Sequence, residues 1–299
     1  MFLIAGSSLP KLGASLARAL GAKLAPASFG LFPNGEQRVQ IKENLAGESV
    51  VILQSLVQPV DQRLVETLLL ADAAERLGAR SIYLLMPWLG YSLQDKVFQP
   101  GEPIASKVVA AMLSTGRFER IFLLDLHNAS EVGFFSLPTE QLNFLPEFAR
   151  YCQTNFELTQ AVVVSPDFGG LKRARELADL LGTTLANCDK NRNRQSGEVK
   201  IMDLHGSVQG LDAIVFDDVI ATGGTAGEIA KTLKSNGAKS VHWLATHGLF
   251  VGQAFEQLKN SQIDSIVISN SIEHKILPAR TSVIDLTDIL TKTLKPWLR

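Results

Sequence analysis

The sequence predicts an α/β protein made of two tandem domains, each built on a mainly parallel central sheet. Two observations support this prediction. Short apolar runs of four to eight residues alternate along the chain with longer amphipathic stretches, a pattern typical of parallel strands that are covered by helices on both faces. The order of elements in the first half of the chain also returns in the second half, as expected for two similar domains in tandem.

The apolar runs locate the strands. The first, Met1–Ser8, is apolar for only a few residues and lacks the basic lead of a signal peptide, so it is expected to form a strand. Further strands are expected at Val50–Gln54, Ser81–Met86, Arg120–Asp125, Ala161–Val164, Thr184–Asn187, Ala213–Phe216, Val241–Ala245 and Ser265–Ile268. Helices are expected at Gln62–Leu77, Ile104–Leu113, Leu171–Leu181, Ala226–Asn236 and, closing the chain, Asp285–Leu298.

The repeated order of elements is clearest around two glycines. Gly78 follows a strand and a helix in the first half, and Gly237 follows the same two elements 159 positions later. This offset fits two similar domains, although a chance similarity between two strand–helix–strand units would give the same pattern. No clear strand can be placed in Thr139–Arg150, so the boundary is expected there. We therefore assign residues 1–143 and 285–299 to the N-terminal domain and residues 144–284 to the C-terminal domain.

Composition and charge argue against several classes of protein. The chain of 299 residues carries 29 basic and 30 acidic side chains, so it lacks the basic excess of a nucleic-acid-binding protein. Cys152 and Cys188, 36 positions apart and without a second pair, argue against a zinc site or a disulfide framework. The apolar runs are far shorter than a membrane span. The sequence thus indicates a soluble, cytoplasmic protein with no nucleic-acid or membrane partner.

The strongest local signal is the loop Asp217–Thr225, which follows an apolar strand and precedes a helix. Ligands of open parallel sheets bind beyond the carboxyl ends of the strands. Gly223 and Gly224 let backbone N–H groups converge, and the following helix adds the partial positive charge of its N-terminus. Thr222 and Thr225 add hydroxyl donors. Together these groups predict a cradle for a phosphate monoester.

Two adjacent carboxylates, Asp217 and Asp218, open this loop. Because they would repel a phosphate, sugar hydroxyls or a divalent cation are their expected partners. The alternative is a strand end with a solvated aspartate pair and a glycine turn. The loop also lacks the Gly-Lys-Ser/Thr ending of a P-loop, so it is a different kind of phosphate site.

With this loop the sequence resembles the phosphoribosyltransferase-type fold, and other segments narrow the resemblance to the ribose-phosphate diphosphokinase family, also called phosphoribosyl pyrophosphate synthetases. The similarity covers essentially the whole chain, and the short, archaeal-like members look most similar. The matching segments are Phe32–Glu36, Pro87–Tyr91, Gln94–Lys96, Gly101–Ile104, Asp125–His127, Ser165–Gly170, Arg173-Ala174, Asp189–Arg192, Asp217–Thr225 and Ala245–Phe250. Their order and separations make the set specific.

The resemblance implies a reaction as well as a fold. Members of the family transfer the β,γ-diphosphoryl group of ATP to the C1 hydroxyl of ribose 5-phosphate, release AMP and require Mg²⁺. The chain would fold into two phosphoribosyltransferase-like domains and form a homo-oligomer, with ATP bound near the domain junction and partly by a neighbouring subunit. Ribose 5-phosphate would bind to Asp217, Asp218, Ala221, Thr222, Gly223, Gly224 and Thr225.

The resemblance also gives roles to residues outside the loop. Lys190 and Arg192 fall on the family's catalytic Lys-x-Arg positions, where two cations would suit the charge that develops during phosphoryl transfer. Without the resemblance, they would belong to a solvated, mobile basic loop. His127 and Asp167 match metal-site positions, although a lone histidine at a strand end is more often only hydrogen-bonded. The expected ATP-binding residues are Phe32, Asn34, Glu36, Gln94, Asp95 and Lys96.

Three residues depart from the family pattern. Leu93 replaces an arginine that contacts the ATP phosphates, and the lost contact weakens binding unless Lys96 compensates. Asn34 replaces an aspartate, and Ala221 stands where many members have aspartate. Two alternatives therefore stay open. One is a catalytically weakened homologue that binds ribose phosphates or nucleotides and regulates a partner. The other is a phosphoribosyltransferase, against which the tandem domains and the Lys-x-Arg loop argue.

Overall fold

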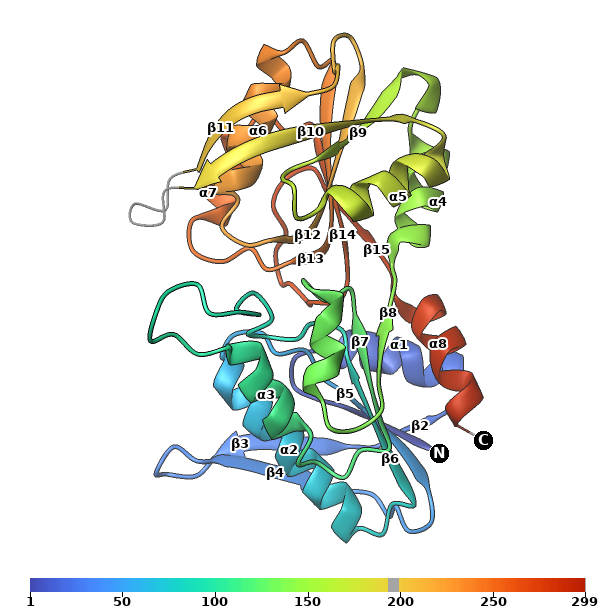
Figure 1. Cartoon of the computed structure of the whole chain (residues 1–299). Coiled ribbons are helices and arrows are strands. Elements are labelled where there is room, and N and C mark those ends of the chain that lie inside the picture. The colour runs from blue at the N-terminus through green and yellow to red at the C-terminus, as the bar shows by residue number, and fades with distance from the viewer. Residues whose placement is uncertain (193–198, 299) are drawn as a thin grey trace. The chain divides into compact units, whose positions relative to one another are not determined.

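The computed structural model describes the backbone of residues 1–192 and 199–298, and the side chains of all of these except residues 190–192 and 199–202. The chain divides into two compact units. The first comprises Met1–Asn143, Ser271–Glu273 and Asp285–Arg299, and the second comprises Phe144–Asn270 and His274–Ile284. Each unit contains a central sheet with helices beside it (Figure 1), which confirms the predicted α/β class.

The first unit is built on a sheet with the strand order β2-β1-β5-β6-β7-β8, in which every neighbouring pair is parallel. Its strands are β1 (Phe2–Ala5), β2 (Lys23–Leu24), β5 (Ser49–Leu53), β6 (Ser81–Met86), β7 (Arg120–Leu124) and β8 (Thr139–Leu142). A separate antiparallel hairpin is formed by β3 (Ala27–Leu31) and β4 (Gln37–Ile41). The helical elements are α1 (Pro10–Leu20), α2 (Val60–Arg76), α3 (Ala105–Leu113), η1 (Ala129–Phe134), α8 (Thr287–Leu294) and η3 (Lys295–Trp297).

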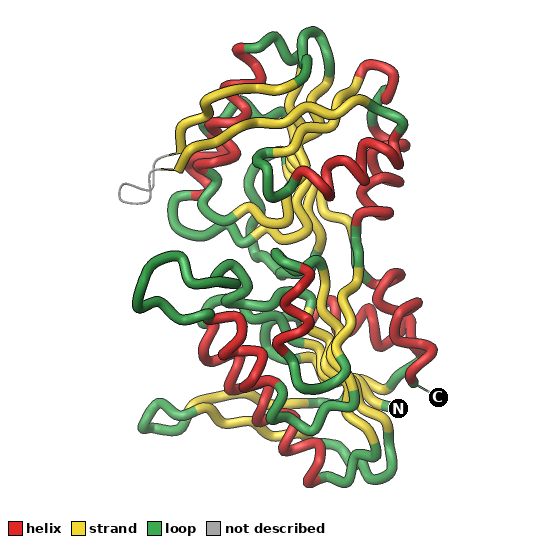
Figure 2. The backbone as a smooth tube through the Cα atoms, in the orientation of Figure 1, coloured by secondary structure: helices red, strands yellow, loops and turns green. Residues whose placement is uncertain are grey.

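The burial pattern of this sheet follows from its sequence. All residues of β5 are buried, as expected of a central parallel strand with helices on both faces. Helices α2 and α3 direct apolar side chains such as Leu70 and Leu113 into a shared core with Ile52 of the sheet. Helices α1 and α8 contact each other beside the same sheet (Figure 2).

The second unit has the strand order β11-β10-β9-β12-β13-β14-β15, and β10–β11 is its antiparallel pair. Its strands are β9 (Ala161–Ser165), β10 (Thr184–Arg192), β11 (Val199–His205), β12 (Asp212–Ile220), β13 (Ser240–Gly248), β14 (Ser265–Ser269) and β15 (Thr281–Ile284). Its helices are α4 (Leu145–Asn155), η2 (Leu158–Gln160), α5 (Leu171–Leu181), α6 (Gly224–Ser235) and α7 (Ala254–Lys259). Among the described residues, neither unit contains a helix with the length and apolar character of a membrane span.

The two units share one topology, which confirms that the order of elements in the first half of the sequence returns in the second half. Apart from β11, the strand order β10-β9-β12-β13-β14-β15 has the same chain sequence as β2-β1-β5-β6-β7-β8. Gly78 and Gly237 have φ values of +79° and +84° at equivalent turns. Gly47 N–H donates to Gly78 O, and Gly210 N–H donates to Gly237 O, both at 2.8 Å.

Several strands extend beyond their predicted ends, because polar residues there continue the backbone hydrogen bonds with the neighbouring strand. β12 runs to Ile220 instead of ending at Phe216, since its last residues pair with the end of β13. β10 pairs with β11 as far as Arg192, whereas the sequence predicted a strand that ends at Asn187 and a mobile polar stretch after it. Residues 193–198 of that stretch lie outside the described residues.

The segment Thr139–Arg150, where no clear strand could be placed from sequence, contains β8 and the beginning of α4. β8 is an edge strand and three of its residues are only half-buried, so it has no continuous apolar run to reveal it. The closing segment Asp285–Leu298 also differs from a single helix. It contains α8 followed by the short 3-10 helix η3.

A short segment between β14 and β15 packs with the first unit. Ser55 Oγ donates to Ser271 O at 2.7 Å, and Leu12 N–H donates to Glu273 Oε1 at 2.8 Å. The sequence predicted that this segment belongs to the C-terminal domain. Its two hydrogen bonds are made by a carbonyl and a carboxylate, and its one buried apolar residue, Ile272, is too short a pattern to indicate where the segment packs.

Candidate active site

The expected phosphate loop follows β12 and leads directly into α6. Gly223 is the last residue before this helix, and its φ of +80° is a conformation that L side chains rarely adopt. A Cβ atom on Gly223 would lie 3.0 Å from Leu258 Cγ, and one on Gly224 would lie 3.1 Å from Gln257 Oε1. The backbone N–H groups of the first turn of a helix have no intrahelical partner. The two glycines therefore allow the start of α6, where helices can bind anions, to pack closely against Leu258 and Gln257 of α7.

Backbone contacts from the neighbouring segment hold the loop. Leu249 N–H donates to Ile220 O at 2.8 Å, and Val251 N–H donates to Ala221 O at 3.0 Å. Thr222 stays exposed beside these contacts. The conformation at position 221 is thus set by its carbonyl group, and a side chain as small as alanine is compatible with the loop.

The two aspartates of the motif belong to β12 rather than to the turn. Asp217 and Asp218 are half-buried, and Asp217 Oδ1 accepts a hydrogen bond from Asp218 N–H at 2.9 Å. Thr225 lies in the first turn of α6 and is also half-buried. The residues Asp217–Thr225 therefore form one strand–turn–helix unit with carboxylate acceptors in the strand and N–H donors at the helix end. Such a unit can hold hydroxyl groups or a cation at one point and a phosphate at another.

A second polar turn leaves the same edge of this sheet. β9 is parallel to β12 and directly beside it, and Asp167 lies in the turn between β9 and α5. Asp167 Oδ1 accepts Gly170 N–H at 2.9 Å, and Ser165 Oγ donates to Asp167 O at 2.7 Å. Lys190 and Arg192 lie on the backbone of β10, the next strand of the sheet, and their side chains are outside the described residues.

In the first unit, the expected ATP-binding residues fall into two groups. Phe32, Asn34 and Glu36 form the turn of the β3–β4 hairpin, where Phe32 N–H donates to Glu36 O at 2.8 Å and Asn34 Oδ1 accepts Glu36 N–H at 3.2 Å. The Phe32 ring is 46% exposed, and the Arg38 guanidinium lies 5.9 Å from its centroid. An exposed aromatic ring of this kind can stack on a nucleobase.

The second group lies between β6 and α3. Gln94 O accepts a hydrogen bond from Ser106 N–H at 3.3 Å. Asp95 Oδ2 accepts one from Asn128 Nδ2 at 2.9 Å. The segment that carries Gln94 and Asp95 is therefore anchored both to α3 and to the turn after β7.

Leu93 and Lys96 flank these two residues. Leu93 is 38% exposed. The ammonium group of Lys96 lies 5.4 Å from the centroid of the Phe98 ring, a cation–π contact. The cation that could compensate for Leu93 thus contacts an aromatic side chain.

His127 is exposed in the turn after β7, and the residues that follow it close a capping box at the start of η1. Asn128 Oδ1 accepts Ser130 N–H at 3.0 Å, and Glu131 Oε1 accepts Asn128 N–H at 3.1 Å. Sequence reasoning missed Asn128 and Glu131. The Asn-x-x-Glu spacing was the available signal, because it resembles the capping boxes that begin helices.

The pKa of Glu131 is raised to about 7, chiefly by burial and also by the nearby Asp95 carboxylate. The hydrogen bond from the Asn128 backbone, the charge of His127 and the Ser106 side chain act in the opposite direction. The folded protein therefore favours the protonated form of Glu131 near neutral pH more than the unfolded chain does.

This pKa leads to a pH-dependent stability. Because the folded pKa of about 7 lies above the ordinary glutamate pKa of 4.5, the contribution of Glu131 to stability is full below pH 4.5 and is lost as the pH rises through 7. The free energy of unfolding should fall by up to about 3 kcal/mol over this window relative to Glu131→Gln. Urea denaturation of both proteins from pH 4.5 to 8 checks this, and parallel pH profiles would contradict it.

The residues matched to metal positions belong to different units, His127 to the first and Asp167 to the second. Over residues 1–192 and 199–298, no group of three or more histidine, cysteine, aspartate and glutamate side chains is arranged to hold a metal ion. Taken separately, an imidazole or a carboxylate is a possible ligand for a Mg²⁺ ion that takes most of its ligands from substrate phosphates and water.

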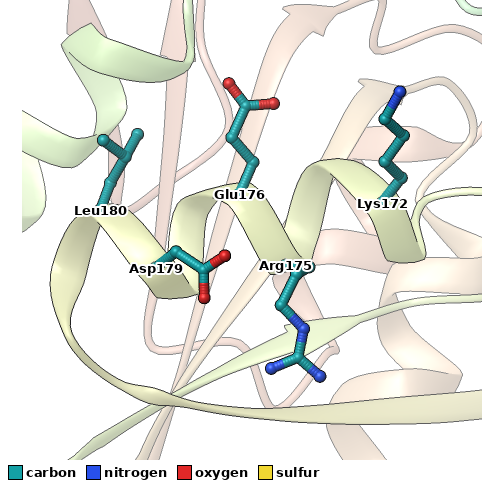
Figure 3. Close-up of a pocket in the computed structure, with 5 residues that line it drawn as sticks. All are labelled: Lys172, Arg175, Glu176, Asp179 and Leu180. Atoms are coloured by element: carbon teal, nitrogen blue, oxygen red, sulfur yellow. The ribbon is translucent and has the colours of Figure 1, made fainter.

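Two surface hollows lie apart from these residues. One, of about 460 Å³, lies along a single face of α5, and Figure 3 shows the side chains that line it, namely Lys172, Arg175, Glu176, Asp179 and Leu180. The other, of about 390 Å³, is lined by Asp61, Leu64, Val65, Tyr91, Pro103, Ala105, Val108, Val109 and Met112. None of the expected site residues lines either hollow, so the candidate site rests on the loops at the ends of the strands.

Comparisons with known proteins found relatives that match nearly the whole chain. Residues 1–116 match the N-terminal domain of ribose phosphate pyrophosphokinase, and residues 183–295 match the phosphoribosyl synthetase-associated domain. A ribose-phosphate pyrophosphokinase of Aquifex aeolicus is 38% identical over 90% of this chain and 86% of the relative. One of Wolinella succinogenes is 35% identical over 98% and 94%. A crystal structure of phosphoribosylpyrophosphate synthetase from Mycobacterium smegmatis has a TM-score of 0.90 and 31% identity, with 99% of this chain and 98% of that chain covered.

A duplicated parallel sheet, with a strand–turn–helix loop suited to phosphate in the second copy, defines a class of α/β enzymes with two phosphoribosyltransferase-like domains. Within this class, the chain belongs to the ribose-phosphate pyrophosphokinase family. This confirms the resemblance that the sequence motifs indicated.

Proposed function

We propose that this protein transfers the diphosphoryl group of ATP to the C1 hydroxyl of ribose 5-phosphate and releases AMP. The observation that carries the proposal is the loop Asp217–Thr225, with its positive-φ glycine before α6, in a chain that matches ribose-phosphate pyrophosphokinases over at least nine-tenths of its length. A phosphoribosyltransferase is not favoured, because that class usually needs only one such domain.

In this proposal, ribose 5-phosphate binds in the second unit. The N–H groups from Gly223 to Thr225 hold the 5-phosphate, and the hydroxyls of Thr222 and Thr225 add donors. Asp217 and Asp218 accept hydrogen bonds from the ribose hydroxyls. A side chain at position 223 or 224 would crowd Leu258 or Gln257, and its absence favours a close approach of the phosphate to the backbone.

The transfer step places negative charge on the oxygens of the moving group, so its rate depends on cations that are already in position. We assign this role to Lys190 and Arg192. Mg²⁺ would be held with the help of His127 and Asp167, and when bound it would neutralise charge on the ATP phosphates. The acceptor attacks the β-phosphorus, the α,β-bridging oxygen leaves with AMP, and the C1 hydroxyl loses its proton.

ATP would bind through residues of the first unit. Phe32 supplies an aromatic face for the adenine. Gln94 and Asp95 supply polar groups. Ser106 anchors the backbone of Gln94, and Asn128 anchors the side chain of Asp95.

We also expect a homo-oligomer, which light scattering of the purified protein would detect.

The direct test is a reaction of the purified protein with Mg²⁺, ATP and ribose 5-phosphate. AMP should form at a rate that depends on all three components, in equal amount with the diphosphate sugar. Ribose 5-phosphate binding without AMP formation from any nucleotide tried would contradict the proposal and favour a regulatory, catalytically weakened homologue. Consumption of phosphoribosyl diphosphate with a nucleobase would instead identify a phosphoribosyltransferase.

Leu93 gives a prediction about the ATP site. Leu93→Arg should lower the KM for ATP about tenfold, because a charge-assisted hydrogen bond to phosphate is worth about 1.5–3 kcal/mol. The matched control is Val97→Arg, which adds the same charge at another exposed position, 52% exposed, on the same segment. Unchanged or weaker ATP binding by Leu93→Arg would show that the site is arranged around leucine.

A further inference from the structure

Glu131 is a buried acid with no part in the proposed reaction. Its side chain is 0% exposed and it lies in η1, four residues after His127. Burying a carboxylate away from water is costly unless hydrogen bonds compensate. The surroundings of Glu131 lead to both anchors of the segment that carries Gln94 and Asp95.

The first anchor runs through Asn128. Glu131 Oε1 accepts the Asn128 N–H at 3.1 Å, which fixes the position of Asn128 at the start of η1. The side chain of Asn128 then has two bonds. Its Oδ1 accepts Ser130 N–H at 3.0 Å, and its Nδ2 donates to Asp95 Oδ2 at 2.9 Å. Because both the oxygen and the nitrogen of this amide are hydrogen-bonded, the amide has one orientation, and its Nδ2 donor is fixed in place beside Asp95.

The second anchor runs through Ser106 of α3. Its N–H donates to Gln94 O at 3.3 Å, and its side chain is 1% exposed. Ser106 Oγ and Glu131 Oε2 are both buried without a hydrogen-bond partner among the described residues. Helix α3, which carries Ser106, packs against η1, which carries Glu131, and the Ser106 side chain lies near enough to lower the pKa of Glu131.

We infer that Glu131 is a positioning residue for ATP, because its buried carboxylate joins the two anchors that hold Gln94 and Asp95. This inference rests on the proposed function, since it assigns these two residues to the nucleotide. Asn128 also follows His127 directly, so the same carboxylate fixes the backbone beside the expected metal ligand. Glu131 does not contact substrate in this account. It acts through Asn128 and Ser106.

The kinetic test compares two substitutions of Glu131. Glu131→Gln keeps an oxygen that accepts the Asn128 N–H, because glutamine also closes a capping box, and its KM for ATP should stay within about twofold of wild type. Glu131→Leu fills similar space without an acceptor, and its KM for ATP should rise about fivefold to tenfold, because the turn that holds Asp95 loses a hydrogen bond worth about 1 kcal/mol. The KM for ribose 5-phosphate should not change in either variant.

A third substitution separates the Asp95 contact from the stability of the turn. Asn128→Asp keeps the oxygen that accepts Ser130 N–H but replaces the donor to Asp95 by a second carboxylate, so the KM for ATP should rise at least as much as in Glu131→Leu. The control is Glu140→Gln, which removes a half-exposed carboxylate 3.8 Å from Arg120 at the sheet edge. Surface pairs of this kind contribute little, so its kinetics should match wild type.

Hydrogen exchange of the ligand-free protein tests the inference independently of catalysis. Peptides covering residues 92–96 should exchange faster in Glu131→Leu than in wild type, Glu131→Gln or Glu140→Gln, while the core strands β5 and β6 stay equally protected. Equal exchange in this segment together with an unchanged KM for ATP would overturn the inference. If wild type forms no AMP, the proposed function fails, and the exchange comparison still decides whether Glu131 holds the segment.

Discussion

Replacement of Gly223 by alanine should lower kcat/KM for ribose 5-phosphate about tenfold to a hundredfold. Gly223 has a φ of +80°, and an added Cβ would lie 3.0 Å from Leu258 Cγ. The left-handed conformation costs an L residue about 1–2 kcal/mol, and the close contact forces the loop to shift. A shift of the N–H groups at the start of α6 weakens charge-assisted bonds to phosphate, each worth about 1.5–3 kcal/mol.

The matched control is Gly210→Ala. Gly210 also has a positive φ, +70°, but no atom lies within 4 Å of an added Cβ. Both variants carry the same kind of backbone cost, and Gly223→Ala alone disturbs the phosphate loop. Calorimetric titration with ribose 5-phosphate and a thermal melt of each variant separate binding from stability. Equal ribose 5-phosphate affinity in Gly223→Ala and wild type would show that this loop does not bind ribose 5-phosphate.

Replacement of Lys190 or Arg192 by alanine should lower kcat about a hundredfold to a thousandfold, the range found when one preorganised donor to a developing charge is removed. The KM values for ATP and ribose 5-phosphate should change only severalfold, because these cations are assigned to the transition state rather than to ground-state binding. The double variant should be little worse than either single variant if the two cations act as a unit.

Lys200→Ala is the control for these variants. Lys200 is on the neighbouring strand β11, in register with Asn191, and it matches no family motif. Its removal takes one positive charge from the same hairpin and should leave kcat within about twofold of wild type. Steady-state kinetics with AMP as the readout compares these four variants with wild type. An equal loss of kcat in Lys200→Ala would mean that the general charge of the hairpin matters, not the Lys-x-Arg positions.

The buried parts of the fold could be predicted from the sequence because apolar runs mark them. The expected bounds of Ser81–Met86 and Leu171–Leu181 agree with β6 and α5. The ends of β12 and β10 could not be predicted, since their polar residues are held by backbone pairing with β13 and β11 rather than by burial. β8 was missed for a related reason, because an edge strand with half-buried Thr139, Glu140 and Gln141 has no apolar pattern.

The candidate site shows the same division. The strand–turn–helix form of the loop Asp217–Thr225 could be predicted because glycines, threonines and a following helix leave a local signature in sequence. The Glu131 contacts could not, because they join segments that are far apart in the chain, at Gln94, Ser106 and Asn128. Burial, which makes Glu131 unusual, depends on packing that a single sequence does not reveal.

The central claim is that a diphosphoryl group moves as one unit to a ribose phosphate, and ³¹P NMR of the complete reaction tests it most directly. With Mg²⁺, ATP and ribose 5-phosphate, we expect the ATP resonances to give way to AMP and to the two coupled resonances of a diphosphate attached to the sugar, with no ADP. Formation of ADP with a monophosphorylated sugar, or unchanged ATP in the presence of folded protein that binds ribose 5-phosphate, would contradict the account.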